Sequence, residues 1–207
     1  MSWDITVSIN DIKNISKIEC EKYLQQFEIY AELHPETNFE TDEGFLPFKV
    51  EFPGINFLKG KVFISGFEVD SNPYDYHEDL DETKIFSHRE KTSEKMNIFL
   101  NLFRKKVNMP SEMTEMHVIN EEADKLLKNC GYQIHLKVNK SIDSFRPIMA
   151  LAFASYLAEK CNGVICDTYS GEYYYNNVKQ VISEQIQELF KALAPNKLLS
   201  HPFESWH

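Results

Sequence analysis

The sequence predicts an α+β protein in which a mostly antiparallel sheet packs against helices. Its first third alternates apolar and polar residues in several short runs, which is the period of a half-buried strand. Two longer helices are predicted later, a buried central helix at about 145–160 and an amphipathic C-terminal helix at about 177–193. The 207 residues suffice for one sizeable core and show no flexible linker, so we predict a single compact domain spanning residues 1–207.

The predicted strands follow apolar alternation or continuous apolar runs. Residues 3–9, 29–33, 46–52 and 132–138 alternate, and a hairpin is predicted at 164–175. Residues 61–69 are apolar in both phases, which indicates a central strand covered on both faces. The acidic residues 68–82 are predicted to form a long loop, with Asn72-Pro73 as a turn signal.

Helix signals separate these strands. Ser16 and Glu19 have the spacing of a capping box before a helix of about three turns, another helix begins near Thr92, and Asn120 is expected to cap a short one. Ser144 is the expected N-cap of the central helix, with Pro147 in its first turn. That helix is apolar on almost every side but too short for a bilayer, so it is predicted to be buried in the core.

Composition limits the classes of function. A formal net charge of −10 opposes binding to phosphate backbones or anionic lipid, so we expect neither nucleic-acid nor membrane binding and favour a basic protein partner. Four cysteines lie on unlike segments without a CxxC pair, and the N-terminus lacks an export signal, which together predict free thiols and a cytoplasmic location. The scattered histidines and cysteines predict neither a structural metal nor a cofactor.

The strongest local charge signal is a stretch of seven carboxylates from Glu68 to Glu82 that contains no Lys or Arg. Such a stretch can steer a basic protein by electrostatic complementarity. Two alternatives are a solubilising acidic surface and a calcium site around His77, although the EF-hand spacing is absent. The residues predicted to meet a partner are Asp70, Asp75, Glu78, Asp79, Asp81 and Glu82.

The candidate for chemistry is the predicted hairpin, where Asp167 lies near the tyrosines at 173–175. A carboxylate and phenols at the edge of an apolar core are able to act in acid–base steps. The competing interpretation is a turn-forming aspartate beside amphipathic aromatic residues. The sequence has no phosphate-binding glycine loop, HExxH motif or nucleophile elbow, so we predict that the protein is not an enzyme.

Three phrases carry a resemblance: GFLPFK at 44–49, ISGFE at 64–68 and LAEKCNGVICD at 157–167. With them the chain resembles small bacterial proteins that include immunity proteins of polymorphic and contact-dependent growth inhibition toxin systems. The resemblance implies a protein that binds a cognate toxin, which the acidic charge suggests is basic and could be a nuclease, and blocks its active site. The alternatives are a small-molecule-binding protein or enzyme with its site near Asp167, and a regulatory or assembly subunit.

Overall fold

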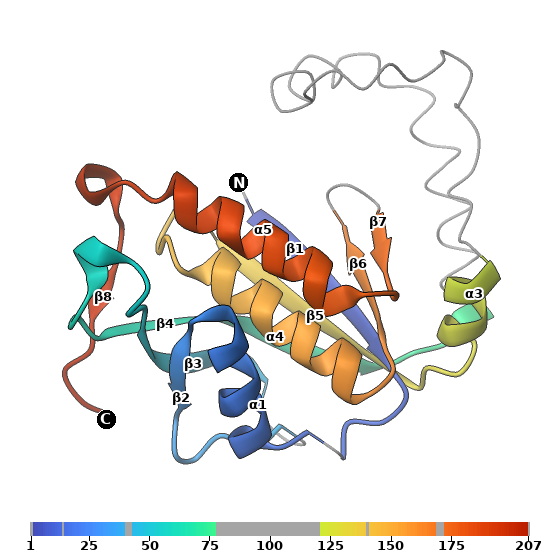
Figure 1. The fold of residues 1–207 in the computed structure, drawn as a ribbon. Helices are drawn as coiled ribbons and strands as arrows, with labels where there is room; N and C mark the ends of the chain where they lie inside the picture. The colour runs from blue at the N-terminus through green and yellow to red at the C-terminus, as the bar shows by residue number, and fades with distance from the viewer. Residues whose placement is uncertain are drawn as a thin grey trace, which may run out of the picture.

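The computed structural model describes residues 2–13, 15–39, 43–77, 121–139, 141–168 and 172–206. These residues form an eight-stranded sheet in which all strand pairs are antiparallel, in the order β2-β3-β4-β5-β1-β6-β7, with β8 beside β4 (Figure 1). The strands are β1 Ser2–Ile9, β2 Tyr30–Leu33, β3 Gly44–Glu51, β4 Phe63–Pro73, β5 Tyr132–Asn139, β6 Val164–Asp167, β7 Glu172–Tyr174 and β8 His201–Pro202. The predicted α+β class is confirmed.

The central helix α4 lies across the sheet and contacts β1, β4, β5 and β6, while α1 and α5 pack against α4 (Figure 1). We call the sheet face that contacts α4 the inner face and the opposite one the outer face. The helices are α1 Lys17–Leu24, α3 Glu121–Leu127, α4 Arg146–Lys160 and α5 Val178–Ala192, with 3-10 turns η1 Gln25–Phe27, η2 Asn56–Leu58 and η5 Pro195–Lys197.

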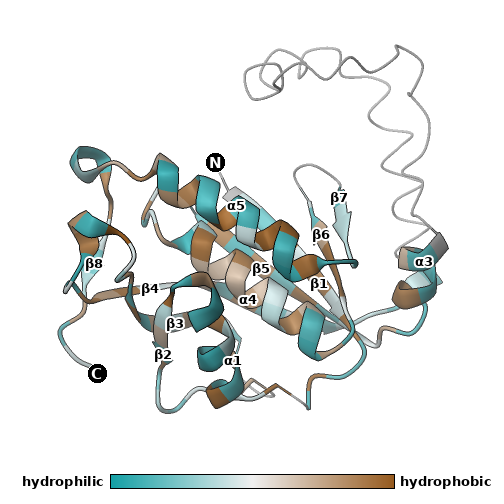
Figure 2. Ribbon diagram, viewed as in Figure 1, coloured by the Kyte–Doolittle hydropathy of each residue, from teal (hydrophilic) through white to brown (hydrophobic). Residues whose placement is uncertain are grey.

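Helix α4 is buried as its composition predicts. Every residue from 147 to 158 is buried, including the polar Ser155, whose hydroxyl is 2.8 Å from that of Tyr23 on α1. The ring of Phe153 lies among Phe39, Phe48 and Phe67 at centroid distances of 5.5–6.2 Å. Figure 2 shows the contrast with α5, which alternates hydrophobic and hydrophilic residues around its surface.

The polar groups at the start of α4 differ from the prediction. Ser144 does not cap the helix; its backbone N–H donates to Leu199 O at 2.9 Å, and its hydroxyl accepts from Leu199 N at 3.0 Å. The buried Asp143 instead accepts a 2.8 Å hydrogen bond from the backbone N–H of Phe145. Ser144 therefore binds the C-terminal tail instead of capping the helix.

The predicted capping box of α1 is absent for a similar reason. The Ser16 side chain makes no capping hydrogen bond. The hydroxyl of Tyr156 on α4 accepts from Ser16 N at 3.0 Å and donates to Ser16 O at 3.1 Å. The helix therefore begins where α4 fixes its backbone.

At the other end of α4, Gly163 allows the chain to turn closely past β1. A Cβ atom at Gly163 would lie 2.6 Å from Ser8 O and 2.8 Å from an Ile9 side-chain carbon. Asn162 has a left-handed backbone, with φ of 49°. The chain then enters β6, and the predicted hairpin forms one edge of the sheet.

Strand β4 is longer than predicted, so the prediction of a loop over 68–82 is wrong for its first six residues. Residues 68–73 continue the strand and pair with residues 132–137 of β5. Alternate residues of this part of β4 face the outer side, where charged side chains are tolerated. The acidic composition therefore suggested a loop where the chain forms a strand. The two-sided burial expected over 61–69 ends at Phe67, because Glu68 is exposed.

The C-terminal tail docks on the sheet. Strand β8 pairs with Phe63 and Ile64 of β4, and Phe203 N donates to Val62 O at 3.0 Å. The Trp206 ring lies 4.9 Å from that of His34 at the end of β2. The predicted helix near Thr92 and the Asn120 cap lie outside the described residues, so the predicted 1–207 extent of the domain is not tested.

Helix α4 provides the first stability prediction. Replacing Leu151, which is 3% exposed, with Asp places an unpaired charge in the core and is expected to lower the free energy of unfolding by roughly 4 kcal/mol or more. Ile18→Asp is the matched control because Ile18 is 64% exposed. Chemical denaturation of the soluble fraction measures both variants, and an unchanged midpoint for Leu151→Asp would contradict the burial of α4.

Asp143 generates a pH prediction. Burial raises the pKa of its carboxyl, against the lowering effects of Ser65, Phe145 N–H, Arg146 and His201. The folded state then takes up the proton before the unfolded state does, so this residue's contribution to stability increases as pH falls from neutral through the raised pKa.

Asp143→Asn keeps the acceptor for Phe145 N–H and removes the buried charge, so we expect it to be more stable than the parent at neutral pH, with the difference shrinking in acid. Asp143→Ala removes the acceptor as well and should lie about 1–3 kcal/mol below Asp143→Asn. Urea unfolding across pH 4–8 measures both differences. A neutral-pH midpoint of Asp143→Asn below that of the parent would show that the charge itself stabilises the fold.

Candidate functional site

The structure describes two of the six acidic residues predicted to meet a partner. Asp70 lies in β4, and Asp75 lies just beyond the strand, where its carboxylate accepts from His77 N at 2.8 Å. The other four, Glu78, Asp79, Asp81 and Glu82, lie outside the described residues, as does most of the alternative calcium site. Of the six, Asp70 is the one that lies on a described strand.

Strand register brings Asp4, which is distant in the sequence, close to Glu68 and Asp70. Lys137 of β5 pairs with Asp4 of β1 on one side and with Glu68 of β4 on the other. Alternation places Asp4, Glu68, Asp70 and Lys137 on the outer face, because Ile5, Val69 and Leu136 between them point inward. We call Asp4, Glu68 and Asp70, together with Lys137, the acidic patch.

The charges of the acidic patch act on one another. The Lys137 ammonium pairs with the Asp70 carboxylate, and this hydrogen bond raises the pKa of Lys137, with further contributions from the charges of Asp70, Glu68 and Asp4. Glu68 and Lys137 are exposed, and Asp4 and Asp70 are half-buried. The patch therefore gathers three carboxylates around one amine.

A row of polar side chains lies beside the patch. Asp70, His135, Thr6, Cys166 and Tyr173 come from five neighbouring strands and are paired in register across the outer face. The Thr6 hydroxyl lies 3.3 Å from His135 Nδ1. Sequence reasoning missed this row because each member comes from a different strand, and only the register shows that they are neighbours.

The side chains of this row do not form a metal centre in the described residues. Within those ranges, no group of three or more His, Cys, Asp or Glu side chains is arranged to hold a metal ion. None of the four cysteines, all of which are described, forms a disulfide. Burial raises the pKa of Cys20, Cys130 and Cys161, that of Cys130 to about 11, so these thiols stay protonated and weakly nucleophilic at neutral pH.

The hairpin around Asp167 makes contacts that fix it to the rest of the sheet. The Trp3 indole N–H donates to Asp167 at 2.9 Å, which joins β6 to the start of β1. The Tyr174 hydroxyl donates to Glu172 at 2.7 Å and accepts from Gln185 of α5 at 3.1 Å. Burial and the adjacent Glu172 raise the pKa of Tyr174, so this phenol stays protonated at neutral pH.

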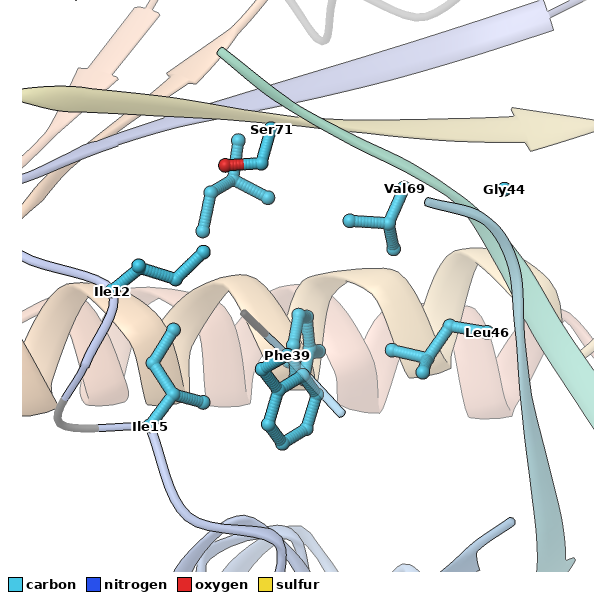
Figure 3. Close-up of a pocket in the computed structure, with 9 residues that line it drawn as sticks. Ile12, Ile15, Phe39, Gly44, Leu46, Val69 and Ser71 are labelled. Carbon is cyan, nitrogen blue, oxygen red and sulfur yellow. The ribbon is translucent and has the colours of Figure 1, made fainter. Parts of the chain in front are cut away.

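A small cavity of about 20 Å³ lies between the inner face and two loops (Figure 3). Ser71 supplies its polar side chain, and the remaining lining is apolar. This volume holds about one water molecule, whereas small-molecule sites usually exceed about 300 Å³. The lining residues are Ile12, Ile15, Phe39, Gly44, Leu46, Val69, Ser71, Ile134 and Phe153.

No helix in the described part of the chain combines the length and apolarity needed to cross a bilayer. The sequence matches no family model, and neither the curated proteins nor the solved structures contain a match to it. The resemblance to immunity proteins is therefore an expectation that these comparisons leave untested.

The acidic patch generates a prediction about Lys137. Asp70→Asn removes the hydrogen-bonded carboxylate and should lower the pKa of Lys137 toward its ordinary value. Because the side chains of Lys137 and Asp70 keep 48% and 39% of their surface exposed, the free energy of unfolding should change little. NMR titration of the lysine side-chain resonances measures the shift. Glu32→Gln is the matched control, since Glu32 pairs with Lys49 at 2.9 Å and should leave Lys137 unaffected.

Proposed function

We propose that this protein binds a basic protein partner through the acidic patch and acts as an immunity protein that neutralises a cognate toxin. The observation that carries the proposal is three carboxylates and one amine on a single sheet face of a chain with net charge −10. Charges fixed on strands present a defined pattern, so they select a partner as well as speeding its approach. Occlusion of the toxin's active site then prevents its activity.

Two further observations favour a binding protein over an enzyme. The cavity between β4 and α4 is too small for a substrate, and the Asp167 hairpin uses its polar groups in contacts within the fold. The outer face presents the exposed Glu68 and Lys137 and the half-buried Asp4 and Asp70 in a register set by antiparallel strands. A surface of this kind suits a protein partner better than a small molecule.

The test is co-expression with the product of the adjacent gene, followed by purification and a growth-protection assay. We expect a complex whose association rate falls as salt shortens the Debye length from about 30 to about 8 Å. The combined change Asp4→Asn, Glu68→Gln and Asp70→Asn should lower the association rate about tenfold at low salt and flatten its salt dependence.

The matched control removes three exposed charges from the helical side of the molecule, with Glu159, Glu184 and Glu188 on α4 and α5 changed to Gln. Both triple variants have the same net charge, so a loss confined to the patch variant locates the interface. If the patch variant binds and protects as the parent does, the partner docks elsewhere. If no partner binds but a small molecule raises Tm in the parent and fails to do so in Asp167→Asn, the ligand-binding alternative replaces this proposal.

A further inference from the structure

Arg146, the first residue of α4, lies over an exposed aromatic ring. Its guanidinium carbon is 5.1 Å from the centroid of Phe45, which is 47% exposed on β3. The sequence contains two other arginines, Arg89 and Arg104, and both lie outside the described residues. Arg146 is therefore the one arginine among the described residues.

No acceptor among the described residues is hydrogen-bonded to this guanidinium. The Arg146 Nε–H is buried and makes no hydrogen bond to the described chain. Asp143, three residues earlier, accepts from Phe145 N–H and acts on Arg146 only through its charge. Because this Nε–H has no accessible surface, a group from outside would meet the terminal nitrogens of the guanidinium, which make no hydrogen bond to the described residues either.

A second cation–aromatic pair in the same fold shows the contrast. Lys49 lies over Phe203 with its ammonium 5.6 Å from the ring centroid. The same ammonium also pairs with Glu32 at 2.9 Å, so its charge is neutralised inside the molecule. The charge of Arg146 has no such hydrogen-bonded carboxylate.

The Arg146 site adjoins the acidic patch. The Phe45 ring lies against Gly66 of β4, where a Cβ atom would come within 2.9 Å of the ring. Phe45 is also paired in register with Glu68, a member of the patch. The exposed Phe45 ring and the Arg146 guanidinium thus border the acidic patch, which meets the partner in the proposed function.

We propose that Arg146 and Phe45 receive one carboxylate group of the protein partner at the edge of the acidic patch. The proposal rests on the proposed function and adds that the basic partner presents a carboxylate next to its basic residues. A guanidinium binds a carboxylate through two parallel N–H···O bonds, and Phe45 shields them from water. Arginine and aromatic residues together are typical of the few positions that dominate binding energy.

The first test measures the complex. Arg146→Lys keeps the charge but loses the two parallel N–H donors of the guanidinium. We therefore expect the affinity for the partner to fall about tenfold, mainly through faster dissociation. Phe45→Ala should weaken binding in the same way. Lys49→Gln is the matched control, because it removes a cation over an aromatic ring whose charge is already paired, and it should leave affinity unchanged. Parent-like dissociation of Arg146→Lys would overturn the proposal.

The second test needs no partner. The buried Nε–H of Arg146 should give a resolved NMR signal that is lost in Arg146→Lys. Sodium acetate should shift it in a saturable manner, whereas sodium chloride at equal ionic strength should not, and Phe45→Ala should weaken the response. If acetate has no effect, the carboxylate site is overturned while a salt-dependent complex still supports the proposed function. If acetate binds but no complex forms, the proposed function fails and the carboxylate site stands.

Discussion

The burial of α4 is the constraint on which the rest of this structure depends. A helix that is apolar on almost every side needs cover on every side, and here the sheet, α1 and α5 supply it. Its few polar groups are used to fix neighbours: Ser155 meets Tyr23, and the Tyr156 hydroxyl binds the backbone of Ser16. Helix α1 and the aromatic residues around Phe153 take their positions from these contacts.

The same packing determines where polar chemistry can gather. Since α4 occupies one face of the sheet, alternation sends the polar residues of β1, β4 and β5 to the other face. Asp4, Glu68 and Asp70 thereby surround Lys137, although β1, β4 and β5 are far apart in the sequence. The start of α4 then sets Arg146 over Phe45, beside the same surface.

The two proposed parts of the interface would have different roles. The carboxylates of the acidic patch act over a Debye length and mainly affect how fast a basic partner arrives. A partly buried guanidinium acts only on contact, so it mainly affects how long the complex lasts. Because α4 determines the position of both, their relative geometry is as rigid as the core.

The sequence by itself determined the α+β class, the buried central helix, the amphipathic last helix and most strands, because apolar periodicity records which face of an element is buried. It failed at Ser144 and Ser16, whose expected caps were replaced by contacts with Leu199 and Tyr156, and at residues 68–73, where acidic composition concealed a strand. Only the tertiary structure decided the acidic patch and the Arg146 site. Both depend on strand register and on where α4 begins, and these are set by packing between segments distant in the sequence.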